Sequence, residues 1–307
     1  MSPRTSEIAR RTAAIEALVC RDVGRKTADL IAASAGGLNA AAQALTGARG
    51  VGFITGFFVP RDGVAAPETD GPVGTALLAC ALAACGLPVR ITVDTPCAEA
   101  VRVAVAEAGG GGVMVDEVGV VDSAGIERVA EEWRRAGVSH AVAIERCGRS
   151  ADGRPRNMRG VDVSAWTAPL DDLFLGGPWT KIAVGDGGNE IGMGRVAAEL
   201  IARTVPNGGQ IACVTPCDHL IVAGVSNWGA YGLMAALAVQ RADWGGIIRK
   251  FLTAERDLAV TRAIVEKAGA VDGVTARREP TVDGFAADIH GSLIESLARV
   301  AWAEAPD

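Results

Sequence analysis

Short apolar runs alternate along this chain with segments in which apolar residues recur at helical spacing. We predict buried strands at Val51 to Val59, Val89 to Val93, Gly112 to Val115 and Val138 to Ile144, and the end of another at Ile182 to Val184. Only a few residues connect each strand to the next helical segment. Because parallel strands need helical crossovers, the pattern predicts an α/β fold: a doubly wound, mostly parallel sheet with helices on both faces, in a Rossmann-like three-layer arrangement.

Helical periodicity fills most of the remaining chain. Residues from about Thr5 to Leu45 contain two helical patterns, which we interpret as an N-terminal helical extension (residues 1–45) packed on the sheet. Gly71-Pro72 opens a helix through Ala84, with proline in the first turn, where its missing N–H costs nothing. No internal repeat or low-complexity linker is present, so residues 1–307 are predicted to form a single domain. Further helices are predicted around Val101 to Ala108, Ile126 to Trp133, Ala223 to Gln240, Asp243 to Lys267 and Ile289 to Val300.

A glycine-rich turn follows the strand that ends at Val184, and we call residues 185–188 the glycine turn. A helix is predicted from Asn189 or Glu190 onward. Open α/β sheets bind ligands at such carboxyl ends of strands. No nucleotide is expected, since the third glycine of a dinucleotide-binding motif falls on Glu190 and no P-loop lysine follows. The carboxylates of Asp186 and Glu190 suit an ammonium group or a divalent cation, and the alternative is a tight turn in which Asp186 caps a helix.

Polar residues that follow other predicted strands are further candidates. After the strand ending at Ile144, a long loop offers Arg146 and Arg159, whose planar guanidinium groups match a carboxylate; a solvated basic loop is the alternative. The apolar run at residues 210–215 is interpreted as another strand, which places Asp218 and His219 near its carboxyl end. This pair is a candidate for acid–base work, and a structural histidine is the alternative.

The segment that opens the predicted helix after Ala223 combines small and polar residues. Free N–H groups at a helix amino terminus attract anions, so Ser226 and Asn227 are candidates for binding a carboxylate. Close helix packing through Gly229 and Gly232 is the alternative explanation of the small residues.

Composition narrows the classes of partner. A net charge of -6 without a basic cluster argues against nucleic-acid and membrane partners. The seven cysteines form no metal-binding spacing and are interpreted as reduced thiols, with Cys213 and Cys217 as core residues in preference to metal ligands. Two apolar windows of membrane-span length are interrupted by polar or turn residues and are interpreted as buried soluble elements. No secretory signal is recognised, so a cytoplasmic location is expected.

Several motifs together resemble the D-glutamate cyclase C-terminal domain family. The stretch Gly185-Asp-Gly-Gly-Asn-Glu-Ile-Gly-Met-Gly is similar to one signature of that family, and Ala223-Gly-Val-Ser-Asn-Trp-Gly-Ala-Tyr-Gly is similar to a second. The resemblance implies a hydro-lyase that converts D-glutamate to 5-oxo-D-proline with loss of water. The further matching segments are Thr55-Gly-Phe-Phe-Val-Pro, Glu68-Thr-Asp-Gly-Pro, Ala151-Asp-Gly, Asn157-Met-Arg, Asp171-Asp-Leu-Phe and Val282-Asp-Gly.

Cyclisation of glutamate makes specific chemical demands. The amine attacks the side-chain carboxyl of the same molecule, so a site must deprotonate the ammonium, neutralise the attacked carboxylate and release an oxygen as water. We predict that Asp186 and Glu190 hold and deprotonate the amine. His219, beside Asp218, is predicted to protonate the leaving oxygen.

The same residues leave alternatives for cofactor and function. Glu68, Asp70, Asp186 and Glu190 are alternatively predicted to bind Mn²⁺ or Mg²⁺, which would activate the carboxyl. The substrate is expected to be a small acidic amino acid, and the oligomeric state is left open, with a homo-oligomer as one alternative. The alternative function is an acidic amino-acid binding protein without turnover. The predicted substrate-binding residues are Arg146, Arg159, Asn157, Gly187, Gly188, Asn189, Ser226, Asn227, Glu68 and Asp70.

Overall fold

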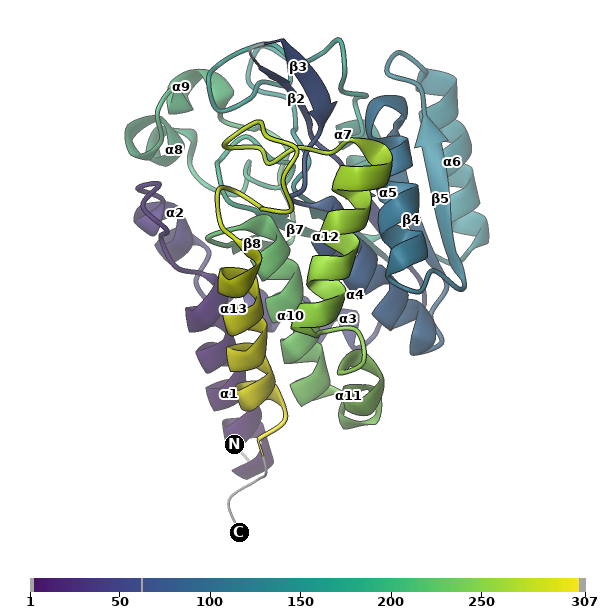
Figure 1. Cartoon of the computed structure of the whole chain (residues 1–307), viewed down its shortest axis with the longest axis vertical. Helices are drawn as coiled ribbons and strands as arrows, with labels where there is room; N and C mark the ends of the chain where they lie inside the picture. The colour runs from purple at the N-terminus through teal and green to yellow at the C-terminus, as the bar shows by residue number, and fades with distance from the viewer. Residues whose placement is uncertain (1–2, 62, 304–307) are drawn as a thin grey trace.

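A parallel sheet forms the centre of the molecule in the computed structural model, which describes residues 3–61 and 63–303 (Figure 1). In chain order its strands are β1 (Val51–Thr55), β4 (Val89–Asp94), β5 (Val113–Val118), β6 (His140–Ile144), β7 (Thr180–Gly185) and β8 (His219–Val222). Across the sheet the order is β5-β4-β1-β6-β7-β8, and every neighbouring pair is parallel. The predicted fold class is confirmed.

This strand order creates a topological switch point between β1 and β6. The chain proceeds from β1 outward to β4 and β5, and then returns to β6 and continues outward in the other direction. Ile144, the last residue of β6, is in register with Thr55 of β1 and Val184 of β7, so the segments after these three strands emerge side by side. Ligands bind in the crevice at such switch points in open α/β sheets.

Helices cover both faces of the sheet, and the helix α1 at the amino end lies beside the last helix, α13 (Figure 1). The helices in chain order are α1 (Pro3–Val19), α2 (Ala28–Ala33), α3 (Gly37–Leu45), α4 (Pro72–Ala84), α5 (Thr95–Glu107), α6 (Ser123–Arg135), α7 (Asp171–Leu175), α8 (Ala198–Thr204), α9 (Gly208–Ile211), α10 (Ser226–Gln240), α11 (Ala242–Ile248), α12 (Ala254–Ala268) and α13 (Ala287–Ala301).

Each face of the sheet contributes to its own hydrophobic core, because successive side chains of a strand point to opposite faces. Phe53 of β1 packs into the core that contains α4, α5 and α10, whereas the next residue, Ile54, packs into the core that contains α6 and α7. Helix α10 is buried along almost its whole length. In the described part of the chain, none of the helices has both the length and the apolar composition needed to cross a bilayer.

Three local predictions were wrong. The predicted strand Val51 to Val59 is two elements, because Gly56 adopts a φ of 101° and the chain turns into the hairpin of β2 (Phe58–Arg61) and β3 (Val64–Pro67). The run 210–215 is not a strand, since it begins in helix α9 and its later N–H groups bond to loops, such as Cys213 N–H to the Gly188 carbonyl. The helix expected from residue 189 or 190 begins at Ala198, because the intervening N–H groups of Gly192 and Gly194 bond to Thr215.

Glycines allow α10 to approach its neighbours closely. A Cβ at Gly229 would lie 2.4 Å from Cγ1 of Val184, and one at Gly232 would lie 2.8 Å from Cγ2 of Val19. Both separations are shorter than van der Waals contact, so close packing accounts for these glycines. The sequence had offered this as the alternative to ligand binding.

We expect Gly229→Ala to lower the free energy of unfolding by about 1–3 kcal/mol, the usual cost of overpacking a core. Gly246→Ala in α11 is the matched control, because a Cβ there meets nothing within 4 Å. The control should stabilise the protein by about 0.4–1 kcal/mol through a less flexible unfolded chain. Urea denaturation of both variants tests this, and stabilisation by Gly229→Ala would contradict the packing explanation.

Candidate active site

A cavity of about 470 Å³ opens above the carboxyl ends of β1, β6 and β7. Its walls come from distant parts of the chain: the linker between α1 and α2, the β2–β3 hairpin, the loop after β6, the glycine turn, and the loop before α13. Acidic side chains lie on its inner surface, and Lys26, Arg61 and Arg159 contribute to its lining as well. The position is the one that the switch point predicts for a ligand site.

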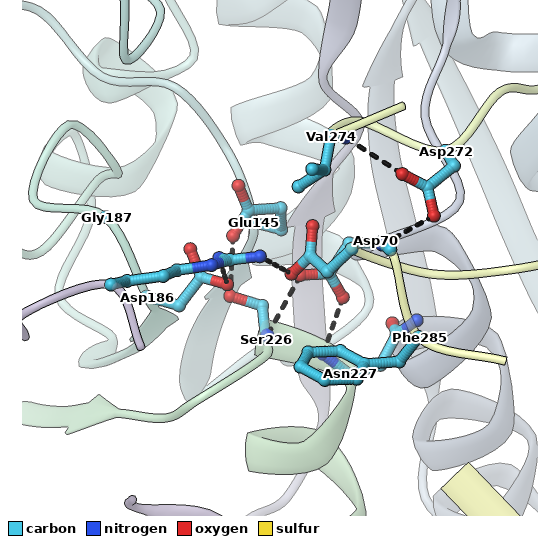
Figure 2. A network of polar contacts seen from close by, with 12 residues as sticks. Asp70, Glu145, Asp186, Gly187, Ser226, Asn227, Asp272, Val274 and Phe285 are labelled. Atoms are coloured by element: carbon cyan, nitrogen blue, oxygen red, sulfur yellow. Dashed lines mark hydrogen bonds and ion pairs between the residues drawn. The ribbon is translucent and has the colours of Figure 1, made fainter. Parts of the chain in front are cut away.

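Three buried carboxylates converge at this place. Asp70, Glu145 and Asp186, which we call the acid triad, each offer a carboxylate oxygen within 4.8 Å of the others. Figure 2 shows them pointing toward one another from three separate segments. Glu145 and Asp186 line the cavity together with Glu68 and Asp283, and Asp70 lies directly behind this lining.

Asp70 is held by the amino terminus of α10. Its two carboxylate oxygens accept the N–H groups of Ser226, at 2.9 Å, and Asn227, at 2.7 Å (Figure 2). In return, Oδ1 of Asn227 accepts the N–H groups of Gly71 and Gly74 at the start of α4, at 2.9 and 2.8 Å. Asp70, which precedes α4, thus accepts from the first N–H groups of α10, and Asn227 of α10 accepts from the first N–H groups of α4. These are the N–H groups that have no partner within their own helix.

Glu145 occupies a constrained position directly after β6. Its φ of 43° lies in the left-handed region, which non-glycine residues rarely adopt outside functional or strained sites. Oγ of Ser226 lies 2.6 Å from its carboxyl group. Gly71, with a φ of 92°, leaves the necessary room, because a Cβ there would lie 2.8 Å from that of Glu145.

Asp186 projects from the glycine turn, and Glu190 fixes the turn's shape. The Glu190 carboxylate accepts the N–H groups of Asp186, Gly187 and Gly188 at 2.9, 2.6 and 2.7 Å. The N–H groups of the turn are therefore occupied from within the chain. Asp186 itself forms an ion pair with Arg25 at 2.7 Å.

Burial and mutual repulsion disfavour the charged forms of these acids. Burial raises the pKa of Glu145 well above its usual range, and the neighbouring carboxylates of Asp186 and Glu190 raise it further. The pKa values of Asp70 and Glu68 are raised by burial and then by the charge of Asp283. Burial also raises the pKa of Asp186, although Arg25 opposes the shift. Protonated and ionised carboxyl groups can therefore coexist here near neutral pH.

The structure separates the predicted binding residues into two groups. Asn157, Arg159, Gly187 and Asn189 line the cavity together with Glu68. The others are engaged in fixing its frame: Gly188 donates to Glu190, and Ser226 and Asn227 already bind the carboxylate of Asp70, which occupies the anion position expected at this helix end.

Arg146 is not placed to clamp a substrate. It is buried in an ion pair with Asp94 at 2.6 Å and donates to the carbonyl groups of Gly56 and Ala168. These contacts tie the ends of β4 and β6 to the loop before α7. Asp94 therefore balances the charge of the guanidinium group that was predicted to bind a ligand, although Nε of Arg146 has no hydrogen-bond partner among the described residues.

Asp218 and His219 were predicted to follow a strand, and this was wrong. β8 begins at His219, which pairs with Ile182, and Asp218 accepts the N–H group of Lys181 near the start of β7. Parallel strands place their amino ends at one edge and their carboxyl ends at the other. The pair therefore lies at the edge opposite the acid triad.

Three residues of the site were not predicted: Arg25, Glu145 and Asp283. The sequence contains a signal for Glu145, since this residue directly follows a central strand and precedes Arg146. Asp283 and Gly284 both have positive φ, at 56° and 79°, and form a two-residue turn between Val282 and Phe285. Nothing in the local sequence connects Arg25 with residues so distant from it.

Comparisons with known proteins give a consistent result. The family model described as D-glutamate cyclase-like, C-terminal, matches residues 15–298. Human mitochondrial D-glutamate cyclase is 36% identical over 211 residues, which are 65% of this chain and 34% of the human protein. The chain therefore matches about a third of the length of this curated relative.

We expect Glu68→Gln to raise the free energy of unfolding at pH 8 in metal-free buffer by roughly 1 kcal/mol, since it removes a buried charge. Burial raises the pKa of Glu68 in the folded protein. The stability linked to its protonation is thus present below about pH 4.3, the unfolded value, and is lost as the pH rises through the folded value. The gain from the substitution should accordingly vanish at pH 4.

Urea denaturation of Glu68→Gln at pH 4 and pH 8 measures this difference. Glu295→Gln, at an exposed position of α13, is the control and should change stability by less than about 0.5 kcal/mol at either pH. An equal gain at both pH values would show that the charge of Glu68 is not the cause.

Proposed function

The chain belongs to the D-glutamate cyclase-like family, and we propose that it closes the ring of D-glutamate to give 5-oxo-D-proline and water. Family membership confirms the resemblance seen in the sequence motifs. The observation that carries the proposed activity is the acid triad, three buried carboxyl groups that meet within 4.8 Å at the switch point, two of which line the cavity. Such a group can both accept and donate protons.

The proposed reaction requires proton transfers that carboxyl groups can carry out. The amine nitrogen forms a bond with the side-chain carboxyl carbon, and one C–O bond of that carboxyl breaks. The ammonium group loses two protons, and both leave with the departing oxygen as water. No net proton is consumed or released, so the site has to move protons from nitrogen to oxygen within one bound molecule.

Two members of the acid triad suit the two ends of that transfer. Asp186, whose charge is supported by Arg25, accepts a proton from the ammonium group. Glu145, whose pKa is raised by burial and by its acidic neighbours, donates from its protonated form to the departing oxygen. These carboxyl groups take the role that the sequence had given to His219. Arg159, on the cavity lining, binds a substrate carboxylate.

Alternatively, the acid triad holds a divalent cation, in which case Glu145 and Asp186 would serve as its ligands instead of transferring protons. Mg²⁺ and Mn²⁺ prefer oxygen ligands, and Asp70, Glu145 and Asp186 would supply one each. A second observation favours a cation: Oε1 of the neighbouring Glu68 is buried and has no hydrogen-bond partner among the described residues. When bound, the cation would polarise the attacked carboxyl group as a Lewis acid. Glu190, predicted as a ligand, is occupied by the glycine turn.

The activity is tested by incubating the purified protein with D-glutamate, with added Mn²⁺ or with EDTA, and quantifying 5-oxoproline by chromatography. L-glutamate under the same conditions reports stereospecificity. Formation of 5-oxoproline from D-glutamate is the expected result. Binding of D-glutamate in calorimetry without product under either condition would refute the lyase and support an acidic amino-acid binding protein.

Glu145→Gln and Asp186→Asn are each expected to lower kcat by roughly 10²- to 10⁴-fold, because each removes a proton-transfer group while keeping its shape. His219→Gln, at the opposite edge of the sheet, is expected to retain turnover. Steady-state kinetics of the three variants, with circular dichroism to verify folding, measures the contrast. Turnover like that of the wild type in Asp186→Asn would refute its role.

A further inference from the structure

A single linker brings a positive charge into the acidic cavity. Arg25, between α1 and α2, forms ion pairs with Asp186 at 2.7 Å and with Asp283 at 2.8 Å. Glu68, Asp70 and Glu145 add further carboxylates around it, and no other ion pair to these five acids occurs among the described residues. The guanidinium group thus acts as the counter-ion of the cavity.

The hydrogen-bonding capacity of Arg25 is little used. A guanidinium group has five N–H donors, and one of them bonds to Asp186. Its buried Nη2 atom forms the ion pair with Asp283 at 2.8 Å, although the geometry of this contact is not that of a hydrogen bond. The side chain is 26% exposed and lines the cavity. Donors therefore remain that can bind a carboxylate in the planar, two-pronged manner of arginine.

The linker that carries Arg25 is built from local contacts at the surface. Oδ1 of Asp22 accepts the N–H groups of Gly24 and Arg25. Gly24 and Lys26 have φ values of 94° and 64°, and the latter is unfavourable for a residue with a side chain. Asp22, Gly24 and Lys26 are exposed, so a shift of this segment costs few core contacts.

Asp186 belongs to two arrangements that compete for its negative charge. Its Oδ2 atom accepts from Arg25, and its carboxylate is also part of the acid triad. A divalent cation bound by the triad would lie about 2.1 Å from its ligand oxygens. A guanidinium group hydrogen-bonded to the same carboxylate would then face a doubly charged ion at close range, which is strongly repulsive in a buried site.

We propose that Arg25, paired with Asp186 in the absence of a cation, binds a substrate carboxylate in addition to the one bound by Arg159, and that a divalent cation on the acid triad displaces Arg25 toward the substrate. The substrate half of this proposal rests on the proposed function, whereas the exchange at Asp186 does not. Loss of Arg25 should therefore affect cation and substrate in opposite directions: the cation loses an internal competitor, and the substrate loses a partner.

The first test is titration of the full chain with Mn²⁺, followed by the electron paramagnetic resonance signal of free Mn²⁺, without substrate. Arg25→Ala is expected to bind Mn²⁺ about tenfold more tightly than the wild type. Lys26→Ala is the matched control, since it removes a like charge from the same linker, and it should change the affinity by less than about threefold. Weaker or unchanged binding by Arg25→Ala, or no Mn²⁺ binding by the wild type, would overturn the exchange.

The second test is the kinetics of D-glutamate cyclisation with saturating Mn²⁺. Arg25→Ala is expected to raise KM by about 10- to 100-fold with a smaller change in kcat, as for loss of a contact made equally in ground and transition states. Arg25→Lys should restore part of the affinity. An unchanged KM would overturn the substrate role of Arg25. Tighter Mn²⁺ binding by Arg25→Ala in a protein that forms no 5-oxoproline would support the exchange and refute the proposed function alone.

Discussion

Backbone N–H groups that bind carboxylates are the interaction on which this site depends. Asp70 takes two of them from the start of α10, and Glu190 takes three from the glycine turn. Peptide dipoles at a helix amino terminus favour negative charge, so the N–H groups of Ser226 and Asn227 offset part of the rise in the pKa of Asp70 that burial causes. Without these donors, so many acids could not gather above the sheet, and the cavity would lose both its frame and its charge.

The buried acids around the cavity lower the stability of the folded protein but supply the groups that its proposed chemistry needs. The remaining acids of the cavity have fewer donors, and burial with mutual repulsion raises the pKa values of Glu145 and Asp186. Each is costly to bury in its charged form, which is a cost that active sites commonly retain. A carboxyl group with a raised pKa remains protonated near neutral pH, so it can donate its proton to a departing oxygen. The raised pKa of these buried carboxyl groups therefore lowers the stability of the fold and at the same time allows proton transfer.

The topology explains why residues far apart in sequence meet at this point. β1, β6 and β7 are neighbours, so the segments after them converge, and Asp70 joins them through the loop that leads into α4. The amino-terminal linker then closes one side of the cavity with Arg25, which lies 161 residues from its partner Asp186.

The sequence by itself determined the alternating strands and helices and the parallel sheet, and it indicated Asp186 and Asp70 as candidate site residues, because periodicity and turn chemistry are local properties. It also contained Glu145, whose place after a central strand went unrecognised. Only the tertiary structure decided which side chains are free: Arg146 is satisfied by Asp94, Glu190 by its own turn, and His219 lies at the wrong edge of the sheet. Pairing between distant segments sets these outcomes, and no local pattern records which partner a charge will meet when the chain folds.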